Sequence, residues 1–177
     1  MCKIIPKIDY SWTLFLDRDG VINKKIEGDY VKSVNEFEFL PKALDSIVKF
    51  SRLFHRIIIV TNQQGISKKL MTEDDLNAIH KHLKKSIQKQ NGKIDAIYFA
   101  PQLATANSYM RKPNIGMALQ AREDFPSIDF KKSIMIGDSI SDMEFADKAG
   151  MKGFFIGNSP KYTSVNSLYN AYQILKY

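Results

Sequence analysis

The sequence predicts an α/β fold, a Rossmann-like doubly wound parallel sheet in a single domain spanning residues 1–177. Short apolar runs of strand length alternate with segments of helical periodicity. The runs are apolar at nearly every position, as in strands covered on both faces. With 177 residues and 44% hydrophobic composition, the chain is long enough for one well-buried core.

Five runs rich in β-branched and aromatic residues are the predicted strands. Each has the length of an ordinary strand and is followed by polar or turn-forming residues. In chain order they cover residues 12–16, 56–60, 96–99, 133–136 and 153–156.

The predicted helices lie between these strands. The clearest covers residues 72–90, in which Leu76, Ile79, Leu83 and Ile87 form one apolar stripe. Thr72 is its predicted N-cap, and acidic residues fill the first turn, where the helix dipole favours anions. The other predicted helices cover residues 41–52, 115–124, 141–149 and 165–176.

One segment breaks the alternation of strands and helices. Residues 21–39 mix polar and apolar positions and contain Gly28 and Asp29, which predicts a small hairpin directly after the first strand. Tyr30 on this hairpin is either part of the entrance to a ligand site or an ordinary packing aromatic.

The net charge and the cysteine content indicate which binding partners and which cellular compartment to expect. The net charge of +7 favours anionic partners, but the basic residues are spread along the chain, which indicates a solvated surface and does not favour nucleic acid. The only cysteine, Cys2, excludes an internal disulfide, and no apolar run is long enough for a membrane span. We expect a cytoplasmic protein with no membrane partner.

Polar residues end three of the predicted strands, where ligands bind in doubly wound sheets. The sequence motifs are Asp17-Arg18-Asp19-Gly20, Thr61-Asn62, and Gly137-Asp138 followed by Asp142; Arg111-Lys112-Pro113 follows the third strand. Together they would bring carboxylates, a hydroxyl and a cation to one rim of the sheet. Such a set suits a magnesium ion and a phosphoryl group.

The residue types indicate a mechanism of phosphoester hydrolysis. Mg²⁺ needs only one or two carboxylates besides water and phosphate oxygens, so Asp17 and Asp138 suffice. Asp17 would be the nucleophile that forms an aspartyl phosphate, and Asp19 would protonate the leaving oxygen and then activate water. Thr61 would donate its hydroxyl to a phosphoryl oxygen, and Lys112 would offset the negative charge.

These motifs resemble, in order, the four motifs of phosphatases of the haloacid dehalogenase (HAD) superfamily. The resemblance covers about residues 12–157 and is strongest to the branch of the heptose-1,7-bisphosphate 7-phosphatases and histidinol-phosphate phosphatases. It implies a minimal cap made from the hairpin and Mg²⁺ as cofactor. We expect the protein to be a monomer or a weak homodimer. The implied substrate is a small phosphorylated metabolite, a sugar phosphate such as D-glycero-D-manno-heptose 1,7-bisphosphate, with histidinol phosphate or a nucleic-acid 3′ end as alternatives.

The resemblance also implies roles for single residues. Metal ligands would be Asp17, Asp138 and, through its backbone carbonyl, Asp19, with Asp142 in or near the outer shell of the ion. Asn62 and Arg111 match positions that contact substrate in that branch.

The sequence departs from this branch at two places. Residues 98–110 contain no Cys or His, whereas the branch commonly binds zinc in this loop, so no zinc is expected. Ser139 replaces a usual lysine, and Ser67-Lys68-Lys69 replaces Ala-Arg-Gly. These changes leave the chemistry intact but weaken the heptose assignment.

Three other interpretations remain open at this point. A phosphoaspartate receiver domain also uses Asp, Thr and Lys, but Asp19 predicts fast hydrolysis of the aspartyl phosphate. A catalytically silent binding protein is disfavoured because every catalytic position is filled. Asp residues at strand ends are often only turn formers. His55, His80 and His82 are predicted on the surface or on helix faces and not as ligands.

Overall fold

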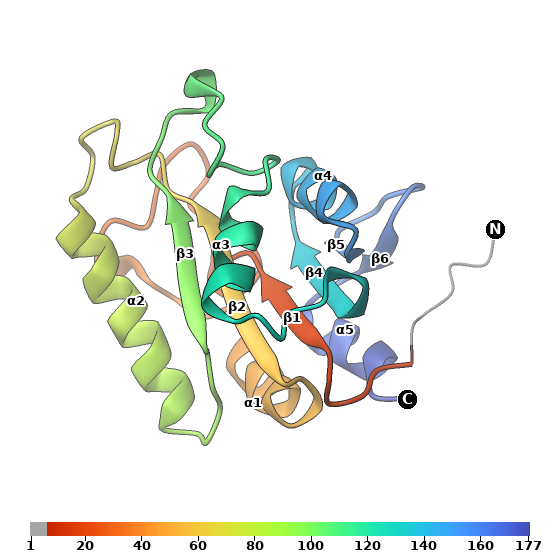
Figure 1. Ribbon diagram of the computed structural model, residues 1–177. Helices are drawn as coiled ribbons and strands as arrows, with labels where there is room; N and C mark the ends of the chain where they lie inside the picture. The colour runs from red at the N-terminus through yellow and green to blue at the C-terminus, as the bar shows by residue number, and fades with distance from the viewer. Residues whose placement is uncertain (1–6) are drawn as a thin grey trace.

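The computed structural model describes residues 7–177 and confirms the predicted α/β fold (Figure 1). Six parallel strands form one sheet in the order β3-β2-β1-β4-β5-β6. The chain order reverses between β1 and β4, which is the switch point where such sheets bind ligands. The strands are β1 Thr13–Leu16, β2 Arg56–Asn62, β3 Ala96–Ala100, β4 Ser133–Gly137, β5 Lys152–Ile156 and β6 Thr163–Val165.

Five α-helices cover the two faces of the sheet, and in Figure 1 α3 and α4 lie in front of it. They are α1 Ala43–Leu53, α2 Glu73–Gln88, α3 Gly116–Asp124, α4 Ile140–Ala149 and α5 Leu168–Leu175. Three short 3-10 helices lie in the connections: η1 Val34–Glu36, η2 Ala104–Ala106 and η3 Phe130–Lys132. Within residues 7–177, no helix combines the length and the apolar character that crossing a membrane requires.

The hydrophobic core has two layers because successive strand residues point to opposite faces. Leu14 and Leu16 of β1 pack with α1, α2 and α5, whereas Phe15 packs with α3 and α4. All three side chains are fully buried. The continuous apolar runs in the sequence therefore reflect a sheet that is covered on both sides.

The strand register places the ends of three strands at one level. Leu16, the last residue of β1, pairs with Ile59 of β2 and with Ile136 of β4. The residues that follow these three positions, including Asp17, Thr61 and Asp138, therefore come together at the carboxyl edge of the sheet.

The predicted hairpin at residues 21–39 is wrong, because the segment contains no strand. One isolated antiparallel bridge joins Asn23 to Phe39, and η1 is the segment's regular element. Its apolar side chains are buried one by one against the core, and Val31 and Phe37 are among them. A strand would place alternate side chains on one face, whereas this spacing favours a packed loop.

The end of the chain also differs from the prediction. The helix expected from residue 165 begins at Leu168, because Ser167 caps it by accepting a hydrogen bond from the Asn170 amide. Residues Thr163–Val165 instead form β6 at the edge of the sheet. A three-residue strand is too short to give a periodic signal in the sequence.

Candidate active site

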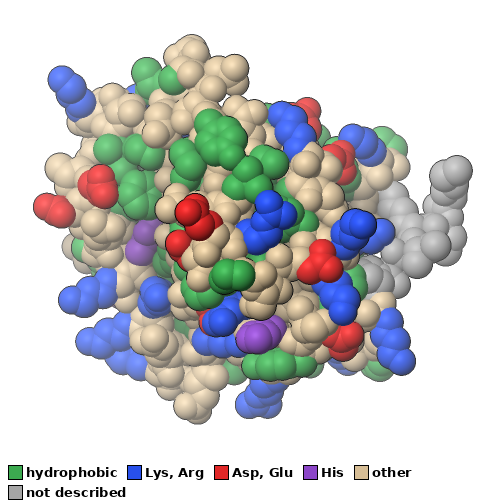
Figure 2. Space-filling model, viewed as in Figure 1, with side chains coloured by type: hydrophobic (Ala, Val, Ile, Leu, Met, Phe, Trp, Pro, Cys, Tyr) green, Lys and Arg blue, Asp and Glu red, His purple; other side chains and the backbone are tan. Residues whose placement is uncertain are grey.

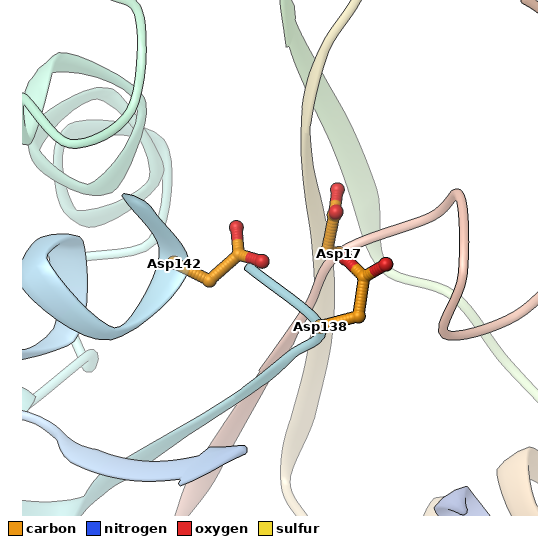
Figure 3. A group of neighbouring side chains, drawn as sticks. All are labelled: Asp17, Asp138 and Asp142. Carbon is orange, nitrogen blue, oxygen red and sulfur yellow. The ribbon is translucent and has the colours of Figure 1, made fainter. Parts of the chain in front are cut away.

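Three carboxylates from separate segments meet at the switch point. Asp17 follows β1, Asp138 follows β4 and Asp142 lies in α4, and one oxygen of each lies within 4.8 Å of the others. Figure 3 shows the Asp142 carboxyl group directed toward the other two. These are three of the four predicted metal-binding residues.

The three carboxylates suit a hard divalent cation. Their oxygens are the ligands that Mg²⁺ prefers, and their mutual repulsion would be relieved by a cation. Oδ1 of Asp138 is buried and has no hydrogen-bond partner among the described residues. A Cβ on Gly20 would lie 2.1 Å from Oδ2 of Asp138, so the close approach of this loop requires glycine. The residues present therefore fit the predicted metal site.

Lys112 is buried between two of these carboxylates. Its Nζ lies 2.9 Å from Asp17 Oδ1 and 2.6 Å from Asp142 Oδ1, and it donates to the backbone carbonyl of Val60 at 2.7 Å. Burial acts to lower the pKa of Lys112, but Asp142 and Asp17 outweigh it and raise the pKa. Lys112 is therefore a fixed positive charge beside the predicted nucleophile.

Asp142 also holds the N-terminus of α4. Its Oδ2 accepts hydrogen bonds from the backbone amide and the hydroxyl of Ser139, at 3.0 and 2.7 Å. A Cβ on Gly137 would lie within 2.5 Å of the Asp142 carboxyl group, so this position also requires glycine. The capping box thus fixes the carboxylate that contacts Lys112.

Thr61 and Asn62 occupy the end of β2. Thr61 is 1% exposed, and its hydroxyl accepts a hydrogen bond from Gln63 Nε2 at 2.8 Å. Asn62 donates to the Lys112 carbonyl and accepts from the Lys112 amide, both at 3.1 Å. Both line the pocket with Asp17. The structure gives Asn62 a role in positioning Lys112, and its predicted contact with substrate stays a prediction.

The side chain of Asp19 lies outside the group of three carboxylates. Arg18 Nη2 donates to both of its oxygens at 2.9 Å, Asn23 donates to Oδ1 at 2.9 Å, and Gln63 donates to Oδ2 at 2.8 Å. Burial alone would raise the pKa of Asp19, but Arg18 and these hydrogen bonds lower it. Asp19 is therefore held as a carboxylate.

The residues that hold Asp19 were not predicted from the sequence. Arg18 is fully buried, and its Nη1 lies 3.3 Å from Nε2 of His80 in α2. Burial, and then the charge of Arg18, lower the pKa of His80 to about 3. Of the two placements predicted for His80, on the surface or on a helix face, the structure shows the second: His80 lies on the buried face of α2.

Burial also shifts the pKa values of two carboxyl groups at the metal site. It raises the pKa of Asp17 to about 7; Lys112 opposes the shift, and the charges of Asp142 and Asp19 add to it. It also raises the pKa of Asp138, against the charge of Lys25. A cation bound between them would favour the ionised forms.

A pocket of about 410 Å³ opens onto these residues. Asp17, Asp19, Thr61, Lys112 and Asp138 line it, together with Arg111 and residues of the 21–39 loop. Arg111 is half-buried and donates from Nη1 to the Gln102 carbonyl at 3.1 Å. The structure thus brings all eight predicted site residues to one pocket.

The loop between β3 and α3 is held by hydrogen bonds. Asn114 Nδ2 donates to the Ser108 carbonyl at 3.0 Å, and the Gly116 amide donates to the Tyr109 carbonyl at 3.0 Å. A Cβ on Gly116 would lie 2.6 Å from that Tyr109 oxygen. This loop carries the Arg111-Lys112-Pro113 motif, so these contacts help to position Lys112.

A solved structure shares this architecture. The D,D-heptose 1,7-bisphosphate phosphatase of B. bronchiseptica, crystallised with magnesium and phosphate, aligns over 93% of this chain and 98% of its own, with a TM-score of 0.85 and 26% identity. The fold and the site define a phosphatase of the HAD type, a phosphomonoester hydrolase. The receiver-domain and silent-binding interpretations are thereby set aside.

The sequence comparisons place the chain more narrowly. Residues 13–154 match the family described as polynucleotide kinase 3 phosphatase, and the chain belongs to this family, in the branch of the heptose-bisphosphate phosphatases. The D-glycero-alpha-D-manno-heptose-1,7-bisphosphate 7-phosphatase of Mycobacterium bovis is 37% identical over 81% of this chain and 75% of its own. The Campylobacter jejuni enzyme of the same name is 39% identical over 84% of this chain and 83% of its own.

Proposed function

We propose that the protein removes one phosphate from D-glycero-D-manno-heptose 1,7-bisphosphate through an aspartyl-phosphate intermediate on Asp17. The observation that carries the mechanism is the position of Asp17. Its Oδ1 lies 2.9 Å from Lys112 Nζ, and one of its oxygens lies within 4.8 Å of an oxygen of Asp138, a pair of carboxylates that suits a divalent cation. The names of the relatives support the choice of substrate. We further propose that the protein works in the cytoplasm.

In the first step, an oxygen of Asp17 attacks the phosphorus atom, and the bond from phosphorus to the sugar oxygen breaks. Asp19 protonates that oxygen, which requires it to take up a proton and to give up hydrogen bonds to Arg18, Asn23 or Gln63. Lys112 neutralises charge on Asp17, and the Thr61 hydroxyl donates to a phosphoryl oxygen.

In the second step, Asp19 takes a proton from water, and the water oxygen attacks phosphorus and releases Asp17. Asp17, Asp138 and the Asp19 carbonyl are the proposed ligands of Mg²⁺, and Asp142 lies beside them. When bound, the ion would neutralise the phosphate oxygens and orient the phosphoryl group.

A 3′-phosphorylated polynucleotide end is the second candidate substrate. The description of the matching family and the net charge of +7 favour it. The distribution of that charge speaks against it, because on the face seen in Figure 2 the Lys and Arg side chains lie at separate points and form no continuous basic surface.

Phosphate release from a substrate panel tests the proposal. The panel contains heptose 1,7-bisphosphate, heptose 7-phosphate, histidinol phosphate and a 3′-phosphorylated oligonucleotide, with the Asp17→Asn variant as the blank. We expect the highest kcat/KM for the heptose bisphosphate and no turnover by the variant. Unreduced turnover by Asp17→Asn would refute the covalent role.

A different ranking would decide between the candidates. A preference for the oligonucleotide, with activity that falls steeply as salt rises, would replace the heptose assignment by the polynucleotide one. A preference for histidinol phosphate would exclude both the heptose bisphosphate and the polynucleotide end as the substrate.

A further inference from the structure

A histidine lies on the buried face of α2, which is otherwise aliphatic. His80 is 7% exposed, and the other buried residues of the helix are Leu76, Ile79, Leu83 and Ile87. A buried polar group costs stability unless it has a hydrogen-bond partner. The imidazole at this position therefore indicates a polar contact that an aliphatic residue would not provide.

The partner of His80 is the buried guanidinium group of Arg18. Nε2 of His80 lies 3.3 Å from Nη1 of Arg18. Every nitrogen of a guanidinium group is a donor, so Nε2 accepts this hydrogen bond and the ring proton lies on Nδ1. Burial and the charge of Arg18 lower the pKa of His80 to about 3, so the ring is neutral near pH 7. A neutral acceptor holds Arg18 without competing with Asp19 as a counter-ion.

The side chain of Arg18 needs a fixed point at its end. Its backbone is held, because its carbonyl accepts hydrogen bonds from the amides of residues 21–23 at 2.8 to 3.3 Å. The side chain itself is long and has many rotamers. Within residues 7–177, the guanidinium group has two side-chain partners, the Asp19 carboxylate and the His80 ring. His80 is the one of the two that takes no part in proton transfer.

The proposed reaction makes this second partner important. Asp19 must give up at least one of its hydrogen bonds to take up a proton and deliver it. A guanidinium group held by Asp19 alone would be free to follow the carboxylate or to turn away from it. With Nη1 held by His80, Arg18 stays in place, and Asp19 returns to one fixed position in the pocket.

We propose that His80 is a positioning residue for the reaction: it holds Arg18, and Arg18 in turn places the Asp19 carboxyl group for proton transfer. The inference rests on the proposed function and adds to it a residue of α2, outside the four sequence motifs. The lining of the pocket, as far as residues 7–177 form it, does not include His80. Its effect on the reaction therefore passes through Arg18.

The test compares two substrates whose leaving groups differ in their need for a proton. His80→Leu removes the acceptor and keeps a side chain that fits an apolar helix face. We expect kcat for D-glycero-D-manno-heptose 1,7-bisphosphate to fall about 10-fold, the order of one hydrogen bond to a charged group, with KM unchanged. The loss for p-nitrophenyl phosphate should be clearly smaller. A merely structural change would lower both rates by the same factor.

Two further variants at the same position sharpen the comparison. The side-chain carbonyl of His80→Gln accepts a hydrogen bond as the imidazole does, so this variant should recover most of the lost kcat. His80→Met removes the acceptor with an unbranched, adaptable side chain, so the result does not depend on how leucine packs. Circular dichroism melting curves of each variant would verify that it is folded.

His82→Leu is the matched control. It removes a histidine from the same helix, but the ring of His82 packs edge-on against Phe37. This variant should leave the ratio of the two rates at the wild-type value. A change in the ratio as large as that of His80→Leu would assign the effect to α2 in general and would contradict the inference.

A double variant shows whether the effect passes through Asp19. His80→Leu added to Asp19→Asn should lower kcat for the heptose bisphosphate little further, because the group that His80 positions is already absent. The same 10-fold factor in both backgrounds would refute the positioning role.

The failure of the inference and the failure of the proposed function give different results. If Asp19→Asn slows the heptose bisphosphate more than p-nitrophenyl phosphate, but His80→Leu slows both equally or neither, the inference fails and the proposed function stands. If Asp19→Asn itself slows both substrates equally, the acid role of Asp19 fails and the inference fails with it.

Discussion

The guanidinium group of Arg18 holds the carboxylate of Asp19 by both oxygens, with Nη2 2.9 Å from each. Arg18 is fully buried, whereas the Asp19 side chain is 24% exposed and lines the pocket. Asp19, the residue proposed to carry the proton, is therefore held on its buried side by the permanent positive charge of Arg18. In this position the Asp19 carboxylate only accepts hydrogen bonds. Before it can protonate a leaving group, it must break at least one of its hydrogen bonds to Arg18 and take up a proton.

Asp19→Asn tests the role of this carboxyl group. We expect kcat for the sugar phosphate to fall by about 10²–10⁴, the usual contribution of general acid–base catalysis. The loss should be smaller for p-nitrophenyl phosphate, because its leaving group needs little protonation. Steady-state kinetics on both substrates measure this difference, and equal losses would contradict the acid role. The melting temperature should also fall, because Arg18 loses its counter-ion.

The neutral state of His80 predicts a dependence of stability on pH. The pKa of His80 is about 3 in the folded protein and 6.5 ordinarily, so below pH 6.5 the unfolded chain binds a proton that the folded chain does not. His80 should therefore contribute a loss of stability as pH falls from 6.5, of up to about 1.4 kcal/mol per pH unit. Asp17, whose pKa is raised to about 7, contributes a change of opposite sign.

His80→Gln is the variant that isolates this contribution. It cannot take up the proton, whereas Asp17 titrates in both proteins, so between pH 6.5 and about 5 the variant should lose less free energy of unfolding than the wild type, or gain some. Urea unfolding at several pH values measures both proteins. If wild type and variant lose stability in parallel, His80 is not the titrating group.

Gly20→Ala should disturb the metal site. Gly20 has φ of 83°, and an added Cβ would lie 2.1 Å from Asp138 Oδ2, so Asp138 or the loop must move. We expect Mg²⁺ affinity to weaken by at least about 10-fold, as for other changes that misplace a metal ligand. Isothermal titration calorimetry measures this. Gly150→Ala is the control, because Gly150 also has positive φ, at 79°, but no atom lies within 4 Å of its added Cβ.

Removal of divalent cations should stop turnover. EDTA should abolish phosphate release, and added Mg²⁺ should restore it, because Asp17 and Asp138 offer the oxygen ligands that Mg²⁺ prefers. Zn²⁺ should not restore activity. Full activity in EDTA after dialysis would exclude the proposed metal-dependent mechanism.

The local signals in the sequence predicted the main elements well and the loops poorly. The five apolar runs correspond to β1 to β5, and Thr72 is the N-cap of α2 as expected. The 21–39 loop was misread because Val31 and Phe37 are buried by packing against the core, and not by pairing in a hairpin. Asp17, Thr61 and Asp138 were predictable as site residues because parallel strands end at a common edge of the sheet.

The sequence by itself determined the class of fold and the chemical groups of the site, because periodicity and strand-end position are properties of neighbouring residues. Only the tertiary structure decided which other residues hold these catalytic groups in place. His80 reaches Arg18 across 62 positions, and Lys68 reaches Tyr30 across 38. Such contacts depend on how α2 and the loops dock on the sheet, and a linear pattern carries no direct record of that docking.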